Sequence, residues 1–381
     1  MMAKFGTWND TAFLPVITVQ NKNIWINCLI FCGMNLTTND IIFLTGANGF
    51  IGSHLAEYFS RQGYQVVCGI RQKNTPDFLQ TLPVKLEYAD ITDLDSLIRA
   101  TKGASVVIHA AAKVSDWGKW QDFYETNVTG TLNVLKTCQI NNIKRIIITG
   151  SVSCYGEEDC EIPKDEQSPH NPRYPYFLDQ VWPSAMNHYR ISKSVAVKET
   201  GEFAIKHQLN VTVIQPVWVY GEREFSSGFY EYMKFVKSRM PFGPGSTKNL
   251  FHVVYVRDLA WAFHLALQHA PNGFNSYIIG NKTVCKQDEI FRLICREMGV
   301  KKPLNIPKAM AWPIGFLAEL AASLLKMKSA PFLTRARVNM FYDSICYSAQ
   351  KAEDELSYSC QYSLEDGIKK TVQWYKDNRL I

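Results

Sequence analysis

The chain has 381 residues, of which 46% are hydrophobic and 20% are charged, so it can fill the core of one large domain or of two interlocked lobes. Its net charge of +6 is small for this length, and no basic run contains interleaved aromatic residues, which argues against a nucleic-acid partner. The 10 cysteines are scattered without the spacing of a zinc site. We therefore expect free thiols in a reducing, cytoplasmic environment and no metal.

Residues 1–38 form a leader before the first predicted strand. Their apolar runs at 13–17 and 24–31 are too short and too interrupted for a membrane span. Lys4 is the only early basic residue and no clear cleavage site follows, which disfavours a signal peptide. Our hypothesis is that translation starts at Met34 and that the leader is disordered or not native, which the intact mass of the native protein would decide.

A glycine-rich turn follows the first predicted strand, residues 41–44. Gly46, Gly49 and Gly52 are spaced G-x-x-G-x-x-G, and a helical pattern covers residues 53–62 up to Gly63. Strand, glycine turn and helix in this order are the context of a dinucleotide fingerprint. The first glycine allows the tight turn, the second lets backbone approach a pyrophosphate, and the third lets helix and strand pack closely. A plain loop is the alternative.

The second strand is predicted at 64–70 and the third at 84–88. The second ends in Arg71, with Lys73 nearby and no acidic residue, which favours NADP(H) because a 2′-phosphate needs a cation. Two solvated surface cations are the alternative. After the third strand, Asp90 is placed to accept from an adenine amino group or an adjacent backbone N–H. Asp93 is placed to cap a helix at 94–100.

A fourth strand at 105–109 leads into small residues at 110–112, over which a cofactor can lie. His109 has no obvious chemical partner, so we expect a packed structural histidine. An amphipathic helix at 123–140 contains Asn127, and a fifth strand follows at 144–149. This alternation of strands and helices predicts an α/β fold with a doubly wound parallel sheet.

Hydroxyl groups follow the fifth strand at the edge where such sheets bind ligands, among them Ser151. Further on, Tyr189 and Lys193 are four residues apart at the start of a helical run, so they share one helix face. A free phenol has a pKa near ~10, and a neighbouring ammonium would lower it. An incidental pair on a solvated helix is the alternative, which the glycine turn and the serine disfavour.

Together these motifs resemble those of the extended short-chain dehydrogenases/reductases, the NAD-dependent epimerase/dehydratase superfamily. The resemblance extends from about Asp40 to the C-terminus and implies a Rossmann fold with a smaller, mostly helical C-terminal substrate lobe. It is carried by the glycine turn at 45–52, Ala89 with Asp90, residues 109–112, Asn127, residues 151–156, Tyr189 with Lys193, and later signatures at 215–221 and 251–258. Two positions depart from the family pattern: Val197 stands where a glutamate is usual, and Gln215 where an arginine is usual.

The resemblance implies roles at the matching positions. Tyr189 would be the general acid/base, Lys193 would bind the nicotinamide ribose and hold the tyrosine pKa down, and Ser151 would bond the substrate oxygen, with Ser153 as the fallback. Asn127 would position these groups. The residues implied to bind NADP(H), or alternatively NAD(H), are Gly46, Asn48, Gly49, Phe50, Ile51, Gly52, Arg71, Asp90, Ile91, Ala110, Ala111, Tyr189, Lys193 and Pro216.

The regular alternation breaks after Gln215. We expect the nucleotide-binding domain at 39–215 with 250–280 returning to it, and the substrate lobe at 216–249 and 281–381. Within these we expect an aromatic-rich helix at 225–239 and a last strand at 276–279. Residues 303–327 are apolar but interrupted by Pro313 and Glu319, so we expect a helix that covers the substrate lobe in preference to one that contacts a membrane.

The tail at 349–377 and the Gly69-Ile70-Arg71 ending resemble the 3β-hydroxysteroid-dehydrogenase-like and dihydroflavonol-reductase-like branches. This favours an oxidoreductase that interconverts a secondary alcohol and a ketone on a fairly apolar, sterol-like or flavonol-like small molecule. A nucleotide-sugar epimerase or dehydratase is the first alternative and a non-catalytic NADP-binding protein the second. A homodimer is compatible with the sequence, and neither the substrate nor the direction of reaction follows from it.

Overall fold

The structure is a computed structural model, and it describes residues 37, 39–71, 77–157, 159–225 and 228–381. These residues all belong to one compact unit. Almost the whole leader predicted at 1–38, including Met34, lies outside the described residues.

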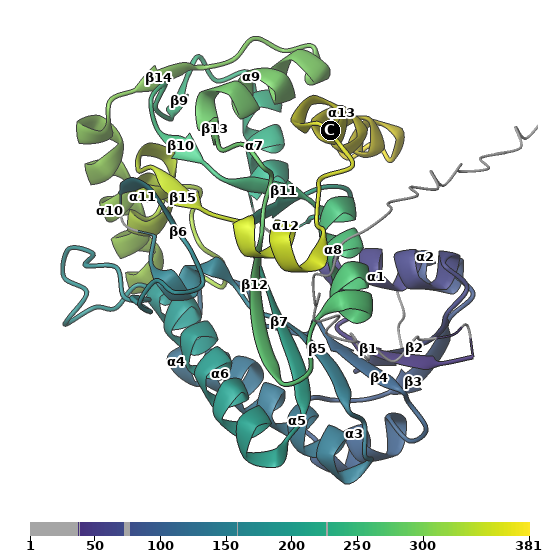
Figure 1. The fold of residues 1–381 in the computed structure, drawn as a ribbon. Helices are drawn as coiled ribbons and strands as arrows, with labels where there is room; N and C mark the ends of the chain where they lie inside the picture. The colour runs from purple at the N-terminus through teal and green to yellow at the C-terminus, as the bar shows by residue number, and fades with distance from the viewer. Residues whose placement is uncertain (1–36, 38, 72–76, 158, 226–227) are drawn as a thin grey trace, which may run out of the picture. The chain divides into compact units, whose positions relative to one another are not determined.

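The centre of the fold is a seven-stranded sheet in which each strand runs parallel to its neighbours. The order across the sheet is β12–β7–β5–β4–β1–β2–β3 (Figure 1). The bounds are β1 Ile41–Thr45, β2 Gln65–Ile70, β3 Lys85–Tyr88, β4 Val106–His109, β5 Arg145–Thr149, β7 Asn210–Pro216 and β12 Phe274–Ile279. The chain winds outward from β1 in one direction and then from β4 in the other, so the predicted doubly wound fold is confirmed.

Helices cover both faces of this sheet. Successive strand residues point to opposite faces, so Ile42 and Leu44 pack against one set of helices while Phe43 packs against the other. The first set comprises α1 Phe50–Arg61, α8 Val256–His269 and α12 Gln350–Leu356, with the short α2 Asp77–Gln80 beside it. The second comprises α3 Leu94–Ala100, α4 Trp120–Phe123, η1 Tyr124–Thr129, α5 Gly130–Ile140 and α6 Ala185–His207. The predicted helix at 123–140 is therefore the continuous run from α4 to α5, with a π-helical turn inside it.

The other elements form smaller sheets and helices in the upper part of Figure 1. Their strands pair as β13–β10–β15–β6, β11–β8 and β14–β9. Tyr232 and Phe291 stack in the core of this region, with ring centroids 3.8 Å apart. The strands are β6 Cys160–Lys164, β8 Trp218–Tyr220, β9 Phe242–Pro244, β10 Leu250–Phe251, β11 Val253–Tyr255, β13 Cys285–Lys286, β14 Leu304–Ile306 and β15 Ile345–Tyr347. The helices are α7 Gly228–Lys237, α9 Gln287–Met298, α10 Lys308–Leu324, α11 Arg335–Tyr342 and α13 Leu364–Asp377.

The chain crosses between the large sheet and this second region more often than we predicted. β6 pairs with β15 of the second region, although β6 lies well before residue 216, the predicted start of the substrate lobe. Conversely, α12 lies near the C-terminus but packs on α8 and on β12 of the large sheet. The cysteines that the structure describes are free thiols, as expected. None of the described helices is both long enough and apolar enough to cross a bilayer.

Candidate active site

The predicted site residues gather at one edge of the large sheet. Because all seven strands are parallel, their carboxyl ends meet at the same edge, where ligands bind in such folds. Many of the predicted residues end one of these strands or follow it closely: Gly46 after β1, Arg71 after β2, Asp90 and Ile91 after β3, Ala110 and Ala111 after β4, Ser151 after β5, and Pro216 at the end of β7. Asn127, Tyr189 and Lys193 lie on helices instead. Positions that are far apart along the chain are thus brought to one edge of the sheet.

The glycine turn has the backbone geometry that the fingerprint requires. Gly46 has φ +75°, in the left-handed region, and its carbonyl accepts from the Gly49 N–H at 2.9 Å. A Cβ atom on Gly52 would lie 2.0 Å from the Gly46 carbonyl oxygen, so only glycine allows this close approach. Helix α1 begins at Phe50, three residues before the predicted start at Ser53, because the turn itself already supplies the first helical residues.

The start of α1 is suited to an anion. Gly49 is the N-cap residue and has no side chain that could accept a hydrogen bond, and no acidic residue lies in the first turn. Asn48 and Gly49 are exposed, whereas Phe50 and Ile51 are half-buried. The backbone N–H groups at this helix end are therefore directed toward an accessible place, as a pyrophosphate requires.

The residues beyond β2 and β3 would lie near the adenosine end of a dinucleotide. Arg71 is exposed and has no hydrogen-bond or ion-pair partner among the described residues, while Lys73 lies outside them. Asp90 Oδ1 accepts from the backbone N–H of Thr92 at 2.9 Å, which is the backbone role that we predicted as one of two. Asp93 caps α3 by accepting from the Ser96 N–H at 3.1 Å, as predicted.

Three predicted catalytic residues come together between β5 and α6. The Ser151 hydroxyl lies close enough to the Tyr189 phenol to lower the pKa of that phenol, and it lies 2.9 Å from the Ser153 hydroxyl. Lys193 lies one turn of α6 after Tyr189 and donates to the backbone carbonyl of Thr149 at 2.8 Å. Ser153 therefore contacts Ser151 rather than taking its place beside the phenol.

The pKa values of the two titratable groups are shifted by burial. Burial raises the pKa of Tyr189 to about 12, although the bond from Ser151 lowers it. Burial also lowers the pKa of Lys193 to about 8. We expected Lys193 to lower the tyrosine pKa, but the groups that lower it are Ser151 and Arg190, and loss of hydration outweighs both.

Asn127 links the end of β4 to the catalytic helix. It lies in η1, a π-helical turn of a kind that is frequent at functional sites. Its amide accepts from the Lys113 N–H at 2.7 Å and donates to the Lys113 carbonyl at 3.1 Å and to the Ser192 hydroxyl at 2.9 Å. Ser192 directly precedes Lys193, so these contacts support the positioning role that the resemblance implies.

His109 is a packed structural histidine, as predicted. Its Nδ1 lies 2.7 Å from the Thr45 hydroxyl and its Nε2 lies 3.1 Å from the Thr131 hydroxyl. Burial lowers the pKa of His109 to about 3, so the ring is neutral at physiological pH. The histidine ties β1, β4 and α5 together.

Sequence reasoning missed a buried ion pair beside the phenol. Arg190 Nε donates to the Glu157 carboxylate at 2.9 Å, and Nη1 donates to the Tyr176 hydroxyl at 2.6 Å. The Arg190 side chain is only 5% exposed. These contacts join Glu157, which follows the turn at 151–156, to Arg190, the residue next to Tyr189. The three residues are distant in sequence, and a lone arginine beside a tyrosine carries no signal of such a pair.

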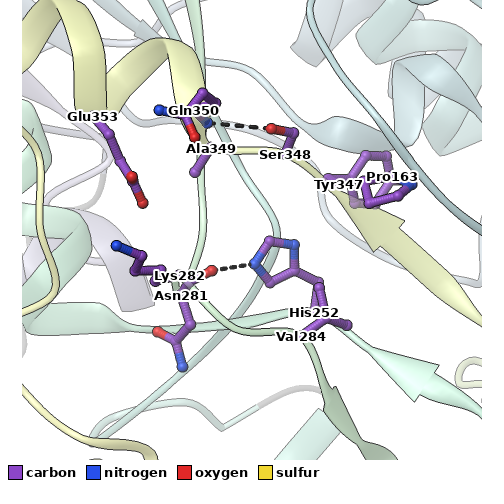
Figure 2. Close-up of a pocket in the computed structure, with 10 residues that line it drawn as sticks. All are labelled: Pro163, His252, Asn281, Lys282, Val284, Tyr347, Ser348, Ala349, Gln350 and Glu353. Atoms are coloured by element: carbon purple, nitrogen blue, oxygen red, sulfur yellow. Dashed lines mark hydrogen bonds between the residues drawn. The ribbon is translucent and has the colours of Figure 1, made fainter.

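A cavity of about 210 Å³ lies away from these groups, in the second region. Figure 2 shows His252 on its wall, where its Nε2 lies 2.6 Å from the Asn281 carbonyl oxygen. Neither Ser151 nor Tyr189 nor Lys193 lines this cavity. We therefore do not assign it to the chemistry of the candidate active site.

The fold and the site together define a dinucleotide-binding enzyme with a Ser–Tyr–Lys set at the edge of a doubly wound sheet. The sequence profile of the NAD dependent epimerase/dehydratase family matches residues 42–280, and the chain belongs to this family. The predicted family and enzyme class are thereby confirmed, with NAD as the cofactor that the family name gives.

Individual relatives cover most of the chain. A Synechocystis sp. protein named for dihydroflavonol 4-reductase activity is 28% identical, over 90% of this chain and 96% of its own length. The 3β-hydroxysteroid-dehydrogenase/decarboxylase isoform 1 of Arabidopsis thaliana is 26% identical, over 86% of this chain and 78% of its own length. Among solved structures, the UDP-glucose 4-epimerase of Thermotoga maritima with UDP-glucose has a TM-score of 0.70 at 22% identity, over 89% of this chain and 99% of the epimerase, which shows a shared fold.

Proposed function

We propose that this protein is an NAD(P)-dependent oxidoreductase that interconverts a secondary alcohol and a ketone on a fairly apolar substrate. The observation that carries the proposal is that Ser151 lies close enough to the Tyr189 phenol to lower its pKa, with Lys193 one helical turn after Tyr189. Ser151 follows β5 at the same sheet edge as the glycine turn after β1, which has dinucleotide-binding geometry. This arrangement provides one proton donor or acceptor and one hydroxyl for a substrate oxygen.

The pKa of Tyr189, raised to about 12, keeps the phenol protonated at neutral pH. A protonated phenol suits carbonyl reduction, because it can give its proton to the oxygen that becomes the alcohol. The Ser151 hydroxyl, which lies near the phenol, would donate its proton in a hydrogen bond to the same substrate oxygen. The Lys193 ammonium, held by the Thr149 carbonyl, then stabilises the phenolate that remains. In the oxidation direction the same groups act in reverse order.

A nicotinamide dinucleotide, when bound, supplies or accepts the hydride. The first turn of α1 would hold its pyrophosphate, and Ala110, Ala111 and Pro216 would line the sheet edge beneath it. A Cβ atom on Gly46 would lie 2.5 Å from the Ala111 backbone nitrogen, so these two predicted segments touch. We further propose a preference for NADP(H), supported by the exposed and unpaired Arg71 within the described residues and by the absence of an acid at the end of β2.

An apolar substrate is supported by the names of the relatives, a dihydroflavonol reductase and a 3β-hydroxysteroid dehydrogenase. The likeness to a UDP-glucose epimerase favours the alternative, a nucleotide-sugar epimerase, at the level of the fold only. An epimerase needs basic groups for a diphosphate in the second region. Arg223, a basic residue just after β8, instead pairs with Glu57 at 2.8 Å and stacks on Phe78 at 3.8 Å from the ring centroid.

Cofactor turnover distinguishes these functions. We expect net NADPH oxidation with a sterol 3-ketone or a dihydroflavonol, and no conversion of UDP-glucose. Tyr189→Phe should lower kcat by about 10²–10⁴-fold, because it removes the transferred proton while leaving the ring. As a matched pair, Ser151→Ala should lower kcat more than Ser153→Ala, because Ser151 is the serine that affects the pKa of the phenol, whereas Ser153 contacts Ser151. Redox-neutral sugar conversion, or full turnover by the phenylalanine variant, would refute the proposal.

A further inference from the structure

Helix α10 presents its large apolar side chains to the outside. Met310, Ile314, Leu317 and Leu324 recur at helical spacing and are 57%, 51%, 60% and 75% exposed. Its buried residues are instead Ala311, Gly315, Glu319 and Ala322. A helix on the surface of a globular protein normally buries its large apolar residues. In α10 the large apolar residues named above are exposed, and small residues are buried in their place.

The inward side of α10 is closely packed against the rest of the protein. Gly315 lies so close to α11 that a Cβ atom there would come within 2.7 Å of the Val338 side chain. Glu319 pairs with Arg335 at 2.9 Å, and both side chains are buried. The outward residues therefore cannot turn inward, because small residues and a buried ion pair fix which side faces the protein.

The apolar surface continues beyond α10. Phe177, Leu178 and Val181, which precede α6, are 55%, 44% and 80% exposed. Phe177 packs edge-to-face on Trp312, with ring centroids 5.7 Å apart, so this segment adjoins the helix. We call the combined region the α10 apolar surface, and it consists of Phe177, Leu178, Val181, Met310, Ile314, Leu317, Leu324, Leu325 and Met327.

The unpaired charges that follow the C-terminal end of α10 are positive. Glu319 is the only acidic residue in α10, and it is buried and neutralised by Arg335. Lys326 and Lys328 follow the helix, are exposed, and have no ion-pair partner in the part of the chain that the structure describes. An apolar helix face that ends in unpaired lysines is complementary to a bilayer surface with anionic headgroups. A second copy of the chain would bring two equal sets of lysines together instead.

From this geometry we propose that α10 lies in the plane of an anionic phospholipid surface, with the α10 apolar surface in the acyl boundary and Lys326 and Lys328 at the headgroups. The 17-residue helix is about 26 Å long, which suffices to lie along the interface. None of the described helices can cross a bilayer, so contact would be in-plane. Figure 1 shows α10 beside α11, to which its inward side is fixed. The proposal does not depend on the substrate.

Vesicle flotation of the full chain tests this proposal. We expect the protein to float with phosphatidylcholine vesicles that contain about 30% phosphatidylserine, and less with phosphatidylcholine alone. The double variant Ile314→Glu/Leu317→Glu should bind about tenfold more weakly or worse, because it places charge at the acyl boundary. Lys326→Ala/Lys328→Ala should also bind about tenfold more weakly at low salt, with a smaller effect at high salt.

Ile205→Glu is the matched control, because Ile205 is 73% exposed but lies on α6. It should float like the unaltered protein. All variants keep residues 1–36, so any binding through those residues is common to them. The replaced side chains are exposed, and an unchanged thermal unfolding midpoint would verify folding. Equal flotation of the double variant, no flotation of the unaltered protein, or a vesicle-free dimer that the double variant dissociates would overturn the proposal.

Discussion

Lys193 is the active-site residue whose charge changes nearest to neutral pH. Burial lowers its pKa to about 8, so it is an ammonium at pH 7 and becomes a neutral amine as the pH rises. In the proposed mechanism, this loss would remove the positive charge that stabilises the phenolate left after proton transfer from Tyr189. We therefore expect kcat/KM for carbonyl reduction to fall above pH about 8, by about tenfold for each further pH unit, as a pH profile of the purified protein would measure.

Lys193→Arg is the control for this pH dependence. A guanidinium stays charged to far higher pH, so the decline above pH about 8 should disappear or move upward even if the variant is slower overall. A decline at the same pH in both proteins would show that another group is responsible.

The glycine turn joins strand β1 to helix α1. The close packing at this turn limits which side chains position 52 can accept. In Gly52→Ala the new methyl group would lie 2.0 Å from the Gly46 carbonyl oxygen, a backbone atom that cannot move alone. We expect the free energy of unfolding to fall by about 3 kcal/mol, as overpacking of a fixed contact does. Denaturant unfolding of the purified variant measures this.

Gly103→Ala is the comparison for Gly52→Ala. Gly103 has φ +85° but nothing lies within 4 Å of the added methyl group, so only backbone strain of about 1 kcal/mol should appear. If both variants lost the same stability, the close approach of α1 to β1 would not be the cause.

Arg335 fastens three elements together. It donates to the Glu319 carboxylate of α10 and to the backbone carbonyls of Phe177 and Trp182, and its side chain is almost fully buried. Arg335→Met would leave Glu319 buried and unpaired, which should cost about 3–5 kcal/mol of unfolding free energy. Arg335→Lys keeps the charge but not the planar fork, so denaturant unfolding should show only partial recovery. Full stability of the methionine variant would contradict this.

These elements also show what sequence patterns could and could not predict. The strands β1 to β5 and β12, the Asp93 cap and the structural His109 follow from local patterns, and the structure confirms them. The pairing of β6 with β15 joins residues far apart in the chain, so no local signal predicts it. The raised pKa of Tyr189 could not be predicted from the sequence either, because it is caused by burial under segments that are distant along the chain. An apolar helix near 303–327 was predictable, but its outward apolar face depends on packing against α11.

At the scale of the whole molecule, the sheet edge that carries the predicted cofactor residues is also contacted by the second region. The large sheet supplies the strand ends, and the loop after β8 returns to α1, where Arg223 donates to the Ser53 hydroxyl at 3.1 Å. A dinucleotide bound at this edge would therefore contact a unit whose parts are already fastened together. Binding to the folded state alone stabilises the whole protein, by about 2.7 kcal/mol at a hundredfold excess over Kd.

This linkage makes thermal unfolding a measure of cofactor preference. If Arg71 binds a 2′-phosphate, Arg71→Ala should weaken NADPH binding about tenfold, the equivalent of about 1.4 kcal/mol, and leave NADH binding unchanged. The rise in unfolding temperature with NADPH should then shrink while the rise with NADH persists. Lys136→Ala, which removes an exposed cation from α5, is the control for net charge and should change neither. Equal loss with both cofactors would place Arg71 at a shared part of the dinucleotide, and no loss with either would leave it a solvated surface cation.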